Sequence, residues 1–357
     1  MLERLPRGVV IALATGLTLL VVAALVVGVR WWQDERRSLL ARAAAFAPAS
    51  TERMSWTDWQ GVRRTVGVDL DARPSTDEVT AFLDEAFSRD LSTSSALVES
   101  APTLHEEFRF SPATLDWELL AQGPEGAVEI LGFPEDTDFD ELADTLESLG
   151  FTRPDDEIGI WIGGPDVLAQ IGPELTPELQ YFALLPDDGV VLTSDTRGYL
   201  EEAVDSATGE SEHLTSVDDV VEAAESPLVA AVFTGAYACE YLAMSAADDT
   251  DQAQADELVR LAGGVHPLTG FAMATQPAGD ITVSMAFESE DNARHDADSR
   301  ADLARGAAPG QGGDFTDRFE VTSATAQGPV VQLVLQPVEG QYVLSDLTSG
   351  PVLFATC

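Results

Sequence analysis

Short apolar segments pair around tight turns along this chain, and each pair is followed by a segment with helical periodicity. In the first copy, Phe139, Leu142 and Leu146 recur at helical spacing, and Gly150 is placed to end the helix. The pattern occurs three times: residues 113–133 before 138–151, 179–194 before 196–209, and 269–288 before 290–306. Each copy therefore predicts a β-hairpin followed by an amphipathic helix.

Other segments add a helix and further strands. Ser75 and Glu78 have the spacing of a capping box ahead of an apolar stripe, which predicts a helix at 75–89. The apolar runs outside the three copies are predicted as strands, at residues 228–235, 319–325, 330–337, 341–347 and 351–357.

Hairpins that alternate with helices indicate an α+β fold. We expect antiparallel sheets built from hairpin-plus-helix units, with the helices packed on one face. The pattern also allows two similar acidic lobes, residues 74–210 and 211–357. With 45% hydrophobic residues in 357, the chain has enough apolar side chains to build a core despite its charge.

The segment from Val9 to Val29 is uncharged and apolar, and it is long enough to cross a bilayer as a helix. Arginines precede it, and Trp31 and Trp32, which favour the membrane interface, follow it. A cleaved signal peptide is the main alternative, and a buried core helix is a weaker one. We expect a transmembrane helix at 9–29 that contacts the lipid bilayer.

Charge changes sign along the chain. All 19 basic residues are arginine; ten of them and seven of the 62 acidic residues precede residue 74, so residues 1–73 carry +3 and the rest −46. Residues 30–73 are therefore predicted as a basic juxtamembrane helix and linker. The arginines on the two sides of the apolar segment are nearly balanced, so the positive-inside rule barely favours one orientation of the membrane helix. We place residues 1–8 in the cytoplasm, and the acidic region outside it.

Composition excludes several classes of function. A net charge of −43 does not fit a protein that binds nucleic acid by neutralising phosphates. The absence of lysine excludes a Walker A loop and a Schiff base. Serine-nucleophile patterns are absent as well, so we name no catalytic and no cofactor-binding residue.

The chain has two cysteines, Cys239 and Cys357, and they predict one disulfide. Such a bond would tie the last residue to the body of the domain, and it would place that domain outside the cytosol. Two unrelated buried thiols are the alternative. Neither cysteine has a second cysteine or a histidine at the spacing of zinc ligands.

Acidic clusters raise the question of a calcium site. Asp248, Asp249 and Asp251 are weak candidates, although a solvated helix start explains the cluster more simply. A second cluster has acids at four calcium-loop positions but lacks the required glycine, and a helix cap explains it better: Asp136, Asp138, Asp140 and Glu147. The four histidines are isolated in sequence and are interpreted as surface or loop residues: His105, His213, His266 and His295.

The N-terminal anchor, the lack of lysine and three phrases resemble exported, single-anchor membrane proteins of high-GC Gram-positive bacteria. The phrases are residues 238–240 (ACE), 268–273 (LTGFAM) and 350–357 (GPVLFATC). This resemblance implies a cell-envelope location and transfers no catalytic residue.

From these features we expect a single-pass extracytoplasmic protein that binds or scaffolds an envelope protein or polymer. The alternatives are a divalent-cation or ligand-binding module and a carboxylate-dependent cell-wall hydrolase.

Overall fold

The computed structural model describes residues 37–71, 73–156 and 158–357. The predicted cytoplasmic segment 1–8, the predicted membrane segment 9–29 and the first residues of the juxtamembrane segment lie outside these ranges. Among the described residues, no helix has both the length and the apolar character needed to cross a bilayer.

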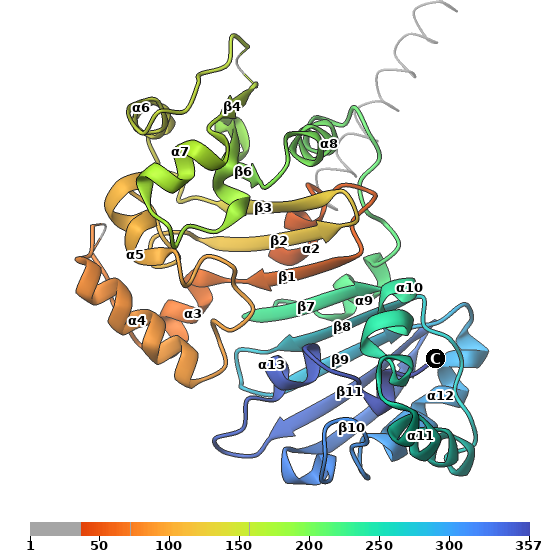
Figure 1. Cartoon of the computed structure of the whole chain (residues 1–357). Helices are drawn as coiled ribbons and strands as arrows, with labels where there is room; N and C mark the ends of the chain where they lie inside the picture. Colours follow the sequence, from red (N-terminus) through yellow and green to blue (C-terminus); the bar gives the residue numbers. More distant parts are fainter. Residues whose placement is uncertain (1–36, 72, 157) are drawn as a thin grey trace, which may run out of the picture.

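Eleven antiparallel strands form one continuous sheet that runs through the whole described region (Figure 1). The expectation of several sheets is therefore wrong. The strand order is β10-β11-β9-β8-β7-β1-β2-β3-β6-β5-β4. The bounds are β1 Arg53–Thr57, β2 Trp117–Gly123, β3 Gly126–Gly132, β4 Ile160–Ile162, β5 Tyr181–Leu185, β6 Val190–Ser194, β7 Val229–Thr234, β8 Gly270–Thr275, β9 Ile281–Ala286, β10 Phe319–Gln327 and β11 Val330–Pro337.

The two halves of the sheet have the same strand arrangement. β1 and β7 pair at the centre, with Ser55 opposite Ala231. Outward from β1 the order is β2-β3-β6-β5, and outward from β7 it is β8-β9-β11-β10. Each half thus contains a central strand and two hairpins, and a helix follows each hairpin. The half that contains β1 has one further strand, β4, at the edge beyond β5. The division into residues 74–210 and 211–357 stays a prediction, and β1 lies inside the predicted linker 30–73.

The helices have these bounds: α2 Leu39–Ala44, α3 Trp59–Val66, α4 Thr76–Ser88, α5 Ala101–Thr103, α6 Phe139–Ser148, α7 Gly164–Ile171, α8 Arg197–Thr208, α9 Asp218–Ala223, α10 Gly235–Tyr237, α11 Asp249–Leu261, α12 Glu290–Leu303 and α13 Val343–Thr348. Short π or 3-10 turns are η1 Leu104–Phe108, η2 Pro177–Gln180, η3 Pro186–Asp188, η4 Ala238–Leu242, η5 Met244–Ala246, η6 Phe315–Asp317 and η7 Leu353–Ala355. The predicted helix at 75–89 is confirmed as α4, and its Ser75–Glu78 capping box is formed.

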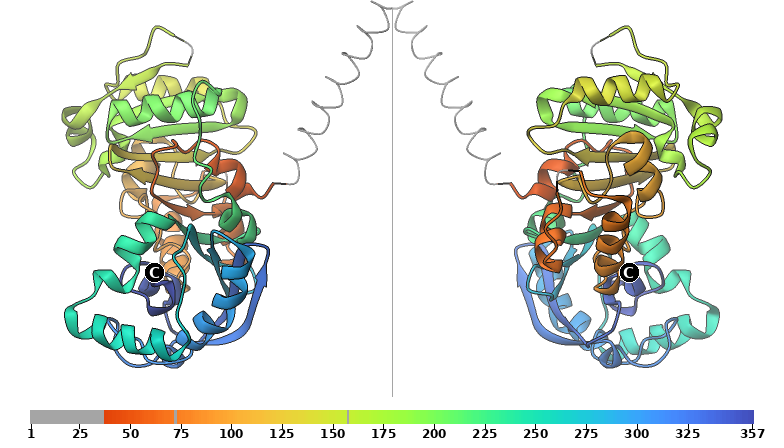
Figure 2. Two further views of the ribbon diagram at one scale, coloured as in Figure 1. Left: turned by 90° about the vertical axis from the view of Figure 1, so that its right-hand side faces the viewer. Right: turned by 90° about the vertical axis from the view of Figure 1, so that its left-hand side faces the viewer.

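Helices cover both faces of the sheet, so the expectation of one covered face is wrong (Figure 2). One core contains side chains of α3, α4, α6, α12 and α13, and the other contains those of α2, α8 and α9. The physical reason is visible in β7, where Phe233 faces the first core and Val232 the second. A strand that is apolar at every position is typical of burial on both faces.

Two of the predicted C-terminal strands are helical. Residues 341–347 contribute to α13 and residues 351–357 to η7. Asp90, which is distant in sequence, accepts hydrogen bonds from the backbone N–H groups of Leu344 and Ser345. These N–H groups open α13, and a carboxylate there stabilises a helix start. A tertiary contact thus decides the helical conformation of this segment.

Candidate functional site

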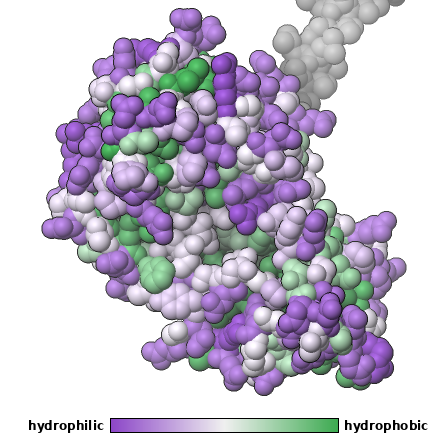
Figure 3. Space-filling view, in the orientation of Figure 1, coloured by the Kyte–Doolittle hydropathy of each residue, from purple (hydrophilic) through white to green (hydrophobic). Residues whose placement is uncertain are grey.

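A groove with a cavity volume of about 630 Å³ lies over the central strands, where the two halves of the sheet meet. Its lining comes from β1, β2 and β7, and from four surrounding segments: residues 93–96, residues 176–178, α10 with η4, and α13 with the residue after it. The same face is seen in Figure 1, and its surface is hollowed between the upper and lower halves in Figure 3. Segments distant in sequence therefore converge on one surface.

Three aromatic rings form a row on one wall of this groove. The ring centroids of Phe233 and Tyr237 are 5.9 Å apart, and those of Tyr237 and Tyr241 are 4.6 Å apart. Tyr241 ends the row with 55% of its surface exposed. The guanidinium carbon of Arg53 lies 5.9 Å from the centroid of Tyr237, and Arg53 Nε donates to Gln122 Oε1 at 2.7 Å.

The local chain geometry explains this row. Thr234 ends β7 and is the N-cap of α10. Its side-chain oxygen accepts a hydrogen bond from the N–H of Tyr237, the last residue of α10. The chain then continues as the π-helical turn η4, and residues four apart on such a turn lie near one another. Tyr237 and Tyr241 therefore extend the row that Phe233 begins on the strand.

Hydroxyl groups line much of the remaining wall. They are contributed by Ser55, Thr93, Ser94, Ser95, Thr176, Ser345, Thr348 and Ser349. The half-buried carboxylate of Glu178 is also part of the lining. The groove thus combines apolar ring surface with many neutral hydrogen-bonding groups and few charges.

A pair of buried glutamates lies beneath the groove. Glu118 Oε2 accepts hydrogen bonds from Trp59 Nε1 at 2.9 Å and from Ser95 Oγ at 2.8 Å. Its Oε1 accepts one from the N–H of Ala96 at 3.1 Å. Burial raises the pKa of Glu118 to about 7 although these donors favour the ionised form. Ser95 and Ala96 separate Glu118 from solvent, since only 1% of its surface is exposed.

Glu129 lies on the neighbouring strand, opposite Leu120, and is fully buried. Neither of its carboxyl oxygens has a hydrogen-bond partner. Burial, followed by the nearby charges of Glu118 and Glu178, raises the pKa of Glu129 well above its ordinary value. The two acids therefore form a desolvated pair inside the sheet layer, and neither reaches a substrate in the groove.

A second polar cluster joins two histidines to one aspartate. Asp296 Oδ1 lies 2.6 Å from His266 Nδ1 and 3.1 Å from His295 Nδ1. The two imidazole rings are perpendicular, with centroids 5.1 Å apart. Both side chains are partly exposed, as interpreted from the sequence, but their proximity in space was not predicted. The two histidines are 29 positions apart, and the β8–β9 hairpin lies between them in the chain, so no short sequence motif indicates the cluster.

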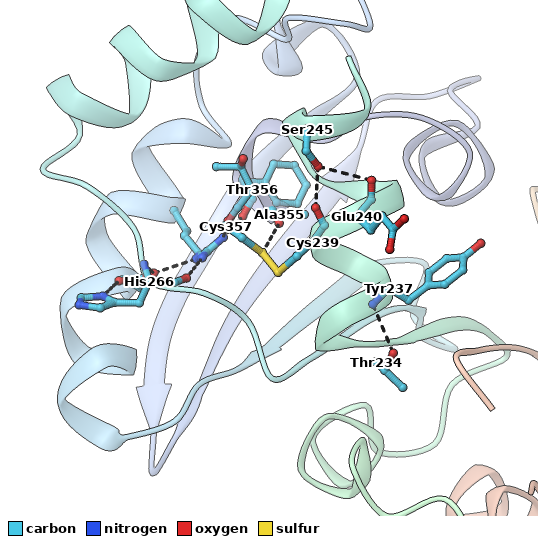
Figure 4. Close-up of a disulfide and its surroundings, with 12 residues drawn as sticks. Thr234, Tyr237, Cys239, Glu240, Ser245, His266, Ala355, Thr356 and Cys357 are labelled. Carbon is cyan, nitrogen blue, oxygen red and sulfur yellow. Dashed lines mark hydrogen bonds and ion pairs between the residues drawn. A yellow bond between two sulfur atoms is a disulfide. The ribbon is translucent and has the colours of Figure 1, made fainter. Parts of the chain in front are cut away.

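Arg300 connects this cluster to the end of the chain. Its guanidinium is fully buried, and it donates to Asp296 Oδ2 at 3.0 Å and to the carbonyls of Phe354 and Thr356 at 2.7 and 2.9 Å. The predicted disulfide between Cys239 and Cys357 is confirmed, with 5.6 Å between the Cα atoms (Figure 4). The last residues are thus fixed both covalently and by a buried cation.

The weak calcium candidates lie at the start of α11. Asp248 is its N-cap and accepts hydrogen bonds from the N–H groups of Thr250 and Asp251, and Asp249 is the first helical residue. In the other acidic cluster, Asp138 caps α6 in the same manner. The geometry is that of capped helix starts, and nothing in the structure tests calcium binding.

A larger cavity, of about 870 Å³, lies beside α6 and contains arginines and acids together. Arg63 already donates to the carbonyl of Leu115 at 2.7 Å and pairs with Asp116. Arg73, which is highly exposed, lies 3.8 Å from Glu141. Arg63 and Arg73 therefore already have ionic partners, and we take the central groove as the better candidate for binding.

Comparisons with known proteins give little guidance. No protein-family model matches the chain, and no curated protein matches it. One solved structure, titled "Structure of crystal form I of TP0453", is similar at 8% identity and a TM-score of 0.37. That match covers 87% of this chain and 97% of the other.

Proposed function

We propose that this chain is a single-pass, membrane-anchored extracytoplasmic protein that binds a saccharide part of an envelope polymer in its central groove. The role is non-catalytic. The observation that carries the proposal is the row of Phe233, Tyr237 and Tyr241 beside a wall of hydroxyl groups.

A sugar ring has an apolar face of C–H groups and a periphery of hydroxyls. The exposed face of Tyr241 suits the former, because aromatic rings bury apolar surface and keep a polar edge wet. Arg53, Gln122 and the serine and threonine hydroxyls suit the latter. The many neutral hydrogen-bonding groups beside a short row of rings therefore favour a saccharide as the ligand.

The proposed location rests on other features. The disulfide supports a compartment outside the cytosol, because thiols there are not kept reduced. The apolar segment 9–29 is the proposed bilayer contact. An alternative role as a cell-wall hydrolase gains no support from the groove, since the buried pair Glu118 and Glu129 does not line it.

The test is binding of a size-fractionated muramidase digest of cell wall to the full chain in a mild detergent. We expect saturable binding that weakens about two- to twelvefold in Tyr241→Ala, because stacking on one ring contributes roughly 0.5–1.5 kcal/mol. Phe87→Ala is the matched control, since Phe87 is similarly exposed, at 53%, and does not line the groove. Equal affinity in both variants would contradict the proposal.

A further inference from the structure

We propose that His266, His295 and Asp296 form a binding site for a first-row divalent transition metal, with Zn²⁺ as its representative. Among the described residues, these three offer ligand atoms that all lie within 4.8 Å of one another. The site is separate from the central groove and from the acidic cluster at Asp248.

The two imidazoles already place Nδ1 against the same carboxylate oxygen. Asp296 Oδ1 is 2.6 Å from His266 Nδ1 and 3.1 Å from His295 Nδ1. Zinc binds imidazole nitrogen and carboxylate oxygen at roughly 2.0–2.2 Å, which places neighbouring ligands a little over 3 Å apart. Small rotations of the two rings would meet this requirement, and an ion would then replace the two hydrogen bonds to Oδ1.

The surroundings favour an ionised and correctly aimed carboxylate. Asp296 Oδ2 accepts hydrogen bonds from Arg300 Nε at 3.0 Å and from the N–H of His266 at 2.8 Å. These contacts occupy Oδ2 and leave Oδ1 facing the two imidazole nitrogens. Partners of this kind around a ligating group typically raise metal affinity tenfold or more.

A metal ion can reach the site from solvent, and the ligand set favours transition metals. The side chains of His266 and His295 are 39% and 46% exposed, whereas Asp296 is fully buried. Three protein ligands leave a position open for water or another molecule. Two imidazoles favour Zn²⁺, Ni²⁺ or Cu²⁺ over Ca²⁺ and Mg²⁺, which prefer all-oxygen sites. The strongly negative domain draws cations toward it.

The site also lies next to the fixed C-terminus. Arg300 donates to Asp296 and to the carbonyls of Phe354 and Thr356, and the disulfide follows at Cys357. His266 and the disulfide can be compared in Figure 4. Binding of a metal at Asp296 would therefore add a further constraint to the segment that closes the fold.

The experiment is calorimetric titration of the EDTA-treated full chain with ZnCl₂, with CoCl₂ as a spectroscopic probe. We expect one equivalent of Zn²⁺ to bind, and Co²⁺ to give the visible absorption of a site with nitrogen ligands. A large excess of Ca²⁺ should not displace either ion. His295→Ala should weaken Zn²⁺ binding at least about tenfold.

His213→Ala is the matched control, since His213 is a partly buried histidine distant from this cluster. Because the side chain of His295 is nearly half exposed, its removal should leave the fold intact, which circular dichroism checks. The proposal is overturned if the wild-type chain binds no stoichiometric Zn²⁺, or if His295→Ala and His213→Ala have the same affinity.

Discussion

Replacement of Glu129 by glutamine should flatten the dependence of stability on pH. In the folded protein Glu118 and Glu129 are both held protonated by burial, whereas in the unfolded chain each ionises near its ordinary pKa of 4.5. At pH values between 4.5 and the raised pKa of each acid, the folded state therefore binds more protons than the unfolded state. The free energy of unfolding therefore falls as pH rises.

The magnitude follows from the number of protons. Each acid that is protonated when folded and ionised when unfolded lowers stability by about 1.4 kcal/mol per pH unit. For Glu118, whose pKa moves from 4.5 to about 7, the total is on the order of 3 kcal/mol. Glu118 ionises first because it accepts three hydrogen bonds, whereas Glu129 has none. Glu129→Gln should therefore halve the contribution of this pair to the slope between pH 5 and 7.

The assay is urea denaturation of the full chain in a mild detergent, followed by tryptophan fluorescence at several pH values from 5 to 8. Taking the difference in unfolding free energy between variant and wild type removes the pH dependence that the other carboxylates contribute. The buried, unpaired amide of the variant lowers stability by the same amount at every pH. Glu125→Gln, on the exposed turn of the same hairpin, is the control and should follow the wild type. Parallel profiles for Glu129→Gln and wild type would refute the reasoning.

Two further predictions concern the C-terminus. Replacement of Cys357 by serine opens a loop of 118 residues and should lower the free energy of unfolding by roughly 5 kcal/mol through the loop-closure entropy of the unfolded chain. Denaturation with and without a reductant measures this, and an unchanged midpoint would contradict it. Arg300→Met should lower the free energy of unfolding by about 3–5 kcal/mol. Asp296 and the carbonyl groups of Phe354 and Thr356 would be left buried without their hydrogen-bond donor. The exposed Arg294→Met on the same helix serves as control, and equal losses in the two variants would argue against a role for burial.

The sequence predicted local structure well where the signal is local. The capping box at Ser75 and the three hairpin-plus-helix units depend on residues close together in the chain, and all are present. The strand β1 falls in the predicted linker, because residues 48–61 have the composition of a segment that breaks a helix and the strand has only five residues. Its identity as the central strand comes from pairing with β2 and β7, which the sequence does not reveal.

The disulfide and the candidate sites also differ in whether local sequence could predict them. The disulfide could be predicted because two cysteines allow one pairing. The groove and the histidine cluster could not, since each combines side chains from segments far apart along the chain. His266 precedes β8 and His295 lies on α12, so the β8–β9 hairpin between them must fold before the two side chains meet.

The sequence alone determined the α+β class, the turns, the caps and the covalent link, because each depends on short-range geometry or on simple counting. Tertiary structure decided that one sheet joins both halves, that helices cover both of its faces, and that residues 341–347 contribute to a helix. It also decided which carboxyl groups are buried away from solvent. The physical reason is that burial and long-range pairing are properties of the packed chain, and they override the weak preferences of short segments.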